Sequence, residues 1–131
     1  MMVVDASAIL AVVLEEDDSA AFETIFSGAA AMVVSAVNYW EVLVRASVIH
    51  GETGASAAED FMNGAGIQVA PADAELARSA AAVFARFGRH TPAKLNLGDC
   101  FAYALAEREK DGLLFKGDDF TKTDIKNARD G

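Results

Sequence analysis

Four short apolar segments, separated by longer stretches with helical spacing, constrain the fold of this 131-residue chain most strongly. Apolar runs this short, bounded by polar or glycine residues, are typical of buried strands. Their alternation with helices favours an α/β fold around a parallel sheet. We therefore predict one domain over residues 1–131, with a central parallel sheet of four to five short strands flanked by helices. The predicted strands are residues 2–5, 32–34, 67–69 and 113–115, with a last strand near Ile125.

The intervening segments carry apolar residues at helical spacing and recognisable capping residues. Ser35 is expected to cap a helix over residues 36–50 that packs Val37, Trp40, Leu43 and Val44 on one side, and Gly51 is expected to end it. Asp73 is expected to cap a later helix in the same way. The remaining predicted helices cover residues 7–14, about 19–27, about 55–63 and 97–110.

The formal net charge of −9 is unevenly distributed along the chain. Residues 1–65 hold ten carboxylates and a single base, Arg45, whereas residues 66–131 hold ten of each. A nucleic-acid-binding module usually shows a basic footprint, so this composition argues against phosphate binding by the protein surface alone. It is compatible with a site in which divalent cations reverse the local charge, and with a basic partner.

The single cysteine, Cys100, cannot form an internal disulfide and is expected to be a small buried apolar side chain. We see no secretion signal, and the apolar run over residues 6–14 is too short to span a bilayer. A reducing cytoplasm is the simplest compartment for such a chain, with no membrane association.

Several acidic residues follow predicted strands. Asp5 ends the first apolar run, and Asp118 and Asp119 come shortly after the fourth. Ligand sites in parallel sheets form outside the carboxyl ends of the strands, so these acids should lie close together. Neighbouring residues point in different directions, and we expect only one of Asp118 and Asp119 to face the site.

Two further acids lie on predicted helices. Asp99 is in the first turn of the helix over residues 97–110, beside Gly98, which permits close approach of another group. Glu41 lies in the middle of the helix over residues 36–50 among apolar and aromatic neighbours. Structural roles stay open for each acid: Asp5 as a helix cap, Asp99 as a partner of the helix dipole, and Glu41 as an exposed surface residue.

Together, Asp5, Glu41, Asp99 and one of Asp118 and Asp119 suggest a metal site, because clustered carboxylates repel one another unless cations are bound. Hard oxygen ligands suit Mg²⁺ or Mn²⁺, which activate water and stabilise charge at a scissile phosphate. Other chemistries lack their motifs: there is no P-loop, no G-x-G-x-x-G and no G-x-S-x-G, and His50 and His90 are not spaced for zinc.

Three segments carry a family resemblance. Residues 3–10, Val-Val-Asp-Ala-Ser-Ala-Ile-Leu, resemble the opening of a PIN domain. Residues 97–106 and 114–125, the latter reading Leu-Phe-Lys-Gly-Asp-Asp-Phe-Thr-Lys-Thr-Asp-Ile, resemble the C-terminal signatures of VapC-type toxins. The family's last signature often reads Gly-Asn-Asp-Phe, so Asp119 is the matching acid and Asp118 replaces an asparagine. Residues 52–87 match only in helical pattern.

The resemblance implies a PIN-like three-layer sandwich in which Asp5, Glu41, Asp99 and Asp119 surround one or two Mg²⁺ or Mn²⁺ ions. Ser7 matches a small hydroxyl residue that supports the first aspartate. The implied activity is ribonuclease cleavage of tRNA or rRNA by a homodimer that a cognate VapB-type antitoxin inhibits. Bases before Asp99, including Arg89 and His90, are expected to contact RNA phosphates.

Two other functions remain open at this stage. One is a non-catalytic PIN-like protein that binds antitoxin or RNA. The other is a metal-dependent phosphatase or DNA nuclease that uses the same carboxylates.

Overall fold

The computed structural model describes residues 1–130 and contains a four-stranded, fully parallel sheet in the order β3-β2-β1-β4. The strands are β1 (Met2–Val4), β2 (Met32–Ser35), β3 (Ile67–Ala70) and β4 (Leu113–Leu114). The helices are α1 (Ala6–Val13), α2 (Ser19–Gly28), α3 (Ala36–Gly64), α4 (Ala74–Phe87) and α5 (Leu97–Glu109), followed by the short 3-10 helix η1 (Ala128–Asp130). The predicted α/β class and parallel sheet are confirmed.

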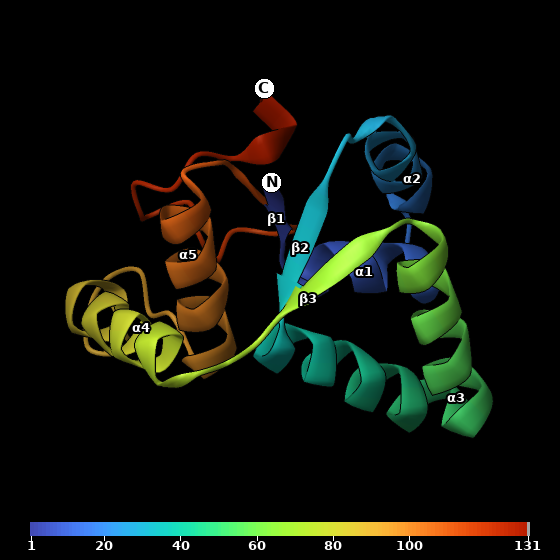
Figure 1. Cartoon of the computed structure of the whole chain (residues 1–131), viewed down its shortest axis with the longest axis horizontal. Helices are drawn as coiled ribbons and strands as arrows, with labels where there is room; N and C mark the ends of the chain where they lie inside the picture. Colours follow the sequence, from blue (N-terminus) through green and yellow to red (C-terminus); the bar gives the residue numbers. More distant parts are fainter. Residues whose placement is uncertain (131) are drawn as a thin grey trace.

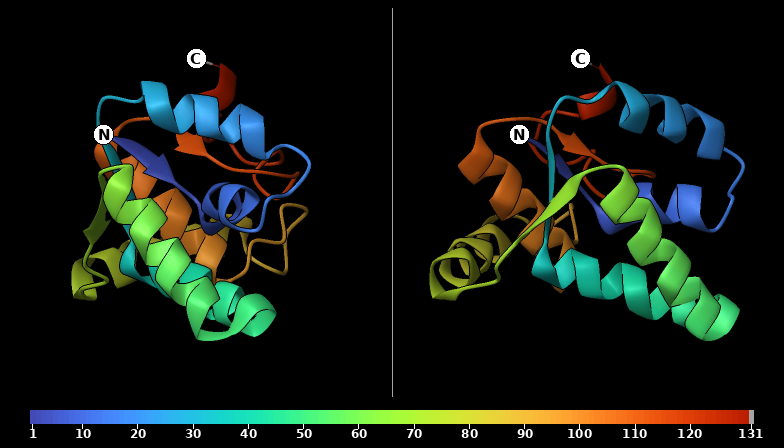
Figure 2. Two further views of the ribbon diagram at one scale, coloured as in Figure 1. Left: turned by 90° about the vertical axis from the view of Figure 1, so that its right-hand side faces the viewer. Right: turned by 45° about the vertical axis from the view of Figure 1, so that its right-hand side comes forward.

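Helices cover both faces of the sheet, which gives three layers (Figure 1). Successive residues of a strand point to opposite faces, so Val3 packs with α4 and α5 whereas Val4 packs with α1, α2 and α3. In β4, Leu113 packs on the same face as Val3, and Leu114 packs on the same face as Val4. Because both faces are buried, the strands read as continuous apolar runs. Figure 2 shows the two helical layers from the side.

The long helix α3 confirms part of the prediction and corrects the rest. Ser35 caps it as expected, since its Oγ accepts a hydrogen bond from the Asn38 backbone at 3.0 Å. Gly51 leaves the helical conformation, with φ of 68°, as the predicted helix end requires. The chain then returns to helical geometry at once, whereas the prediction placed the start of the next helix only at about residue 55. This break separates the half of α3 that carries Glu41 from the half that carries Phe61, whose ring packs against Phe26 of α2.

The predicted apolar side of this helix was wrong at Trp40, which is 62% exposed. The buried stripe consists of Asn38, Val42 and Ala46, which are spaced four residues apart. The predicted strand near Ile125 was also wrong. Only one isolated bridge forms there, between Leu113 and Asn127, because the polar segment before it is occupied by turns.

Asp73 caps α4 through the backbone N–H of Leu76, as predicted. Cys100 is buried and unpaired, also as expected. Among residues 1–130, no helix is both long enough and apolar enough to cross a membrane.

Candidate active site

The carboxyl ends of β1 and β4 bring the first candidate acid to the edge of the sheet. Val4 pairs with Leu114, and the Asp5 backbone N–H donates to the Leu114 carbonyl at 2.9 Å, so Asp5 lies beside the segment that leads to Asp119. Both residues line one pocket of about 590 Å³. Asp118, the alternate, does not line this pocket.

The same pocket collects Glu41 from α3 and Asp99 from α5. Side chains from positions 5, 41, 99 and 119 therefore meet in space although they are far apart in sequence. Ser7, Asn96 and Lys116 also line the pocket, together with Glu16 and Arg45. Sequence patterns gave no signal for Glu16 or Arg45, because neither lies at a strand end or in a recognisable motif.

Asp5 has a structural role in addition to its place in the pocket. Its Oδ2 accepts hydrogen bonds from the Ser7 backbone at 3.1 Å and from the Ser7 hydroxyl at 2.5 Å, which caps α1. The Ser7 hydroxyl in turn accepts from the Lys116 backbone N–H at 3.0 Å. Ser7 therefore fixes the Asp5 carboxylate and links it to the segment after β4.

Asp99 caps its own helix. Its Oδ2 accepts from the Asn96 backbone at 3.1 Å, and its backbone N–H donates to the Asn96 side chain at 2.9 Å. This reciprocal arrangement is a capping box, and it holds Asp99 in a single orientation at the first turn of α5.

Glu41 is held by Asn38, which lies three residues after the helix cap Ser35. The Asn38 amide donates to Glu41 Oε1 at 2.7 Å and to the Gly98 carbonyl at 3.0 Å, and its oxygen accepts from the Ser35 hydroxyl at 2.6 Å. Asn38 is completely buried. It therefore joins the start of α3 to the start of α5 and fixes the Glu41 carboxylate between them.

Asp5, Glu41 and Asp99 share one feature that bears on metal binding. In each carboxylate one oxygen accepts the hydrogen bonds just described, and the other has no hydrogen-bond partner among residues 1–130. The Asp119 carboxylate accepts no hydrogen bond among residues 1–130. An oxygen that is oriented but unpartnered, at the wall of a pocket, is the geometry expected of a metal ligand.

Burial and neighbouring acids disfavour the ionised form of three of these carboxylates. Burial, with smaller contributions from the charges of Glu41 and Asp119, raises the pKa of Asp5 to about 6. Burial, with the charges of Asp5 and Asp119, raises the pKa of Asp99 to about 6 against a small opposing effect of Arg89. The pKa of Glu41 is raised by burial and by Asp99.

The donor set fits a hard divalent cation in its chemistry, because it consists only of carboxylate and hydroxyl oxygens. Among residues 1–130, no three acidic, histidine or cysteine side chains are yet arranged closely enough to hold an ion.

The predicted RNA-contacting bases lie outside this pocket. Arg89 is exposed and donates to the Lys94 carbonyl at 3.3 Å. The His90 ring packs against Phe84 and lies 3.3 Å from the Ala85 carbonyl. Their contact with RNA stays a prediction.

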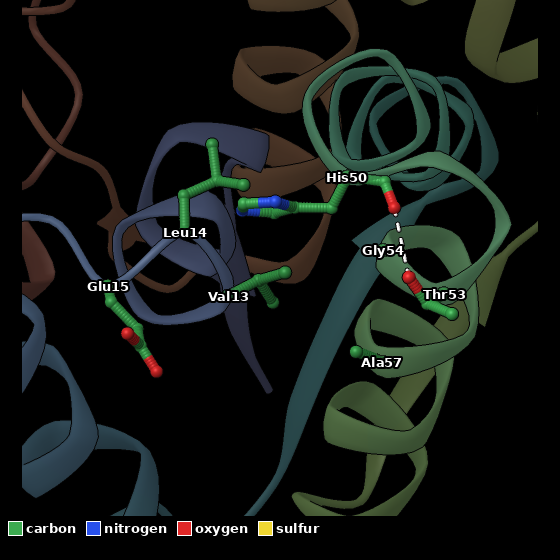
Figure 3. A pocket seen from close by; sticks show the side chains of 7 residues that line it. All are labelled: Val13, Leu14, Glu15, His50, Thr53, Gly54 and Ala57. Carbon is green, nitrogen blue, oxygen red and sulfur yellow. Dashed lines mark hydrogen bonds between the residues drawn. The ribbon is translucent and has the colours of Figure 1, made fainter.

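A second hollow lies where the end of α1 meets the break in α3 (Figure 3). The His50 side chain points across it toward Leu14, and Glu15 is the only acid in its lining. This hollow lacks the paired carboxylates that phosphodiester chemistry requires, so the acidic pocket is the candidate active site.

The fold agrees with the comparisons to known proteins. The family model described as the PIN domain matches residues 2–126. The chain belongs to the PIN domain family. Ribonuclease VapC28 of Mycobacterium tuberculosis is 37% identical over 131 residues, which cover 98% of each chain.

Solved structures support the PIN fold at lower sequence identity. The crystal structure of Mycobacterium tuberculosis VapC20, described as a sarcin–ricin loop cleaving toxin, superposes with a TM-score of 0.81 at 15% identity, covering 95% of this chain and 96% of that one. VapBC2 of Rickettsia felis, solved with a promoter DNA fragment, gives a TM-score of 0.73 at 12% identity, covering 96% and 95%. The predicted family and PIN-like sandwich are thereby confirmed.

Proposed function

We propose that this PIN domain protein is a Mg²⁺- or Mn²⁺-dependent endoribonuclease and the toxin of a VapBC-type toxin–antitoxin module. The observation that carries the proposal is the meeting of Asp5, Glu41, Asp99 and Asp119 in one pocket, with three of them oriented by neighbouring hydrogen bonds. The name of the relative VapC28, a ribonuclease, supports the choice of reaction.

In this proposal Asp5 and Asp99 are the principal metal ligands, and Glu41 and Asp119 complete the set directly or through water. When bound, the cation would activate a water molecule and stabilise charge on the phosphate. Ser7 keeps the Asp5 carboxylate in one rotamer, and Asn38 does the same for Glu41. Among residues 1–130, no side chain of the pocket is an obvious general acid, so water would protonate the leaving group.

The charge of the pocket bears on how RNA, the substrate class that the family resemblance implies, would bind. Its lining contains five carboxylates but only two cationic side chains, Arg45 and Lys116. RNA phosphates would be repelled unless metal ions offset this charge. Arg45 at the pocket, and Arg89 and His90 beyond it, would contact flanking phosphates, and we expect tRNA or rRNA to be cleaved.

We further propose a VapB-type antitoxin as partner and a homodimer as the assembly. The Rickettsia felis VapBC2 structure supports a toxin–antitoxin context. The acidic pocket would attract a basic antitoxin segment. Exposed apolar side chains, Trp40 and Leu97 among them, are the kind of surface that protein partners cover. A cytoplasmic location is part of this proposal, because the single thiol of Cys100 is unpaired.

Incubation of the purified protein with RNA, DNA and a phosphate monoester, each with Mn²⁺ or with EDTA, tests the reaction. We expect cleavage of RNA alone, and only with Mn²⁺. Cleavage of DNA or of the monoester would favour the metal-dependent phosphatase or DNA nuclease. Binding of RNA without any cleavage would favour the non-catalytic PIN-like protein.

A further inference from the structure

Asp119 differs from the other three acids because nothing in the structure holds its side chain directly. It is exposed and has no hydrogen bond among residues 1–130, whereas Asp5, Glu41 and Asp99 are each fixed by a neighbour. Its position therefore depends on how the turn over residues 116–119 is anchored to the rest of the protein.

The base of this turn is closed by two buried aromatic rings. Phe115 and Phe120, which flank the turn, pack with ring centroids 5.0 Å apart. Gly117, inside the turn, has φ of 90°, a conformation that side-chain-bearing residues rarely adopt. The rings fix where the turn begins and ends, and on the side of Asp119 the Thr121 backbone N–H and hydroxyl both donate to the Asp118 carbonyl. The other side of the turn, at Lys116, is held by separate contacts.

Lys116 provides such a contact. Its ammonium lies 2.7 Å from Glu16 Oε1 and 3.1 Å from Asp18 Oδ1, on the connection between α1 and α2. All three side chains are only 30–35% exposed. The Lys116 backbone N–H also donates to Ser7, so this residue ties the turn to α1 at two points.

Asp18 shows that this contact competes successfully with a local alternative. Asp18 precedes α2 and is a favoured capping residue, yet its side chain makes no capping hydrogen bond. It contacts the Lys116 ammonium instead. Two carboxylates thus lie within ion-pair distance of one ammonium.

We propose that Lys116, held between Glu16 and Asp18, is a positioning residue that keeps Asp119 turned toward Asp5 and Asp99 for metal binding. This inference rests on the proposed function, since it assigns the support of one proposed metal ligand. Lys116 acts through the turn and does not contact the RNA.

The test compares Lys116→Met, the double variant Glu16→Gln/Asp18→Asn, and the triple variant that combines them. Lys116→Arg is the conservative variant, and Lys122→Met is the matched control, because Lys122 is exposed in the same segment and has no ion pair among residues 1–130. Two quantities are measured for each protein: the rise in melting temperature caused by Mn²⁺, and the Mn²⁺ concentration that gives half-maximal RNA cleavage.

If Lys116 positions Asp119, Lys116→Met and the double variant should each weaken the apparent affinity for Mn²⁺ by about tenfold and reduce the Mn²⁺-induced rise in melting temperature. Loss of a residue that supports a metal ligand typically has an effect of this size. The triple variant should be no worse than Lys116→Met, because both changes break one contact. The apparent Mn²⁺ affinity of Lys116→Arg should stay within about twofold of the wild-type value, and that of Lys122→Met should equal the wild-type value.

Two outcomes would overturn the inference. If charge alone mattered, Lys116→Met would tighten Mn²⁺ binding and the double variant would weaken it, in opposite directions. If Lys116 bound RNA, Lys116→Met would raise KM for RNA without changing the Mn²⁺-induced rise, and the double variant would cleave normally. Should the wild type fail to cleave RNA, the melting measurements still test the positioning role separately from the proposed function.

Discussion

The Glu41 carboxylate lies directly against Gly98: a Cβ at position 98 would be 2.5 Å from each of its oxygens. This close approach lets the middle of α3 deliver an acid to the first turn of α5, immediately beside Asp99. The sequence pattern predicts close approach of another group at Gly98, and in the structure that group is the Glu41 carboxylate.

Gly98→Ala should therefore displace the Glu41 carboxylate from Asn38. We expect Mn²⁺-dependent RNA cleavage to fall by about 10- to 100-fold, the usual effect of disturbing a metal ligand's support. The fold should survive, because only the far end of a side chain has to move. Cleavage rates and melting curves check this, with Gly28→Ala as the control, since a Cβ there meets nothing within 4 Å. Full activity of Gly98→Ala would show that Glu41 is not needed at this position.

Asp99→Asn should abolish Mn²⁺-dependent cleavage and leave the fold intact. Asparagine can still take part in the hydrogen bonding at the start of α5, but it removes an anionic ligand from the pocket. Circular dichroism and RNA cleavage with and without Mn²⁺ measure the two effects, and Asp111→Asn, at an exposed carboxylate outside the pocket, is the control. Wild-type cleavage by Asp99→Asn would refute the assignment of this acid.

Asp5→Asn should stabilise the metal-free protein at pH 7.5 by about 1–3 kcal/mol. The pKa of Asp5 is raised to about 6 in the folded protein, so ionisation opposes folding, and stability is lost as the pH rises from about 4 through 6. The stabilising effect of Asp5→Asn should accordingly disappear near pH 4. Urea denaturation at several pH values in EDTA measures it. Asp17→Asn serves as an exposed control, and an equal effect of Asp5→Asn at pH 4 and 7.5 would contradict the prediction.

Asn38→Asp should destabilise the fold by about 1–3 kcal/mol at neutral pH, because the new carboxylate cannot donate to Glu41 or to the Gly98 carbonyl. It should also weaken RNA cleavage, since it repels the Glu41 carboxylate. Urea denaturation and cleavage assays test both effects against Asn63→Asp, which makes the same change at an exposed position of α3. Unchanged stability would show that the Asn38 amide is not needed to join α3 to α5.

The residue pattern alone predicted the parallel sheet, its strands and the helix caps at Ser35 and Asp73, because these features depend on local spacing and on capping chemistry that a few neighbouring residues decide. It also identified Asp5, Glu41, Asp99 and Asp119 as a set, through strand ends and through resemblance to the family.

Tertiary structure decided what depends on approach between distant segments. It placed Asp119 rather than Asp118 in the pocket, because the direction of each side chain depends on how the backbone turns after β4. It turned Trp40 outward and Asn38 inward, because the buried stripe of α3 is set by the helices it packs against. Glu16 and Arg45 joined the pocket for the same reason: no local pattern encodes which side chains from separate helices share one hollow.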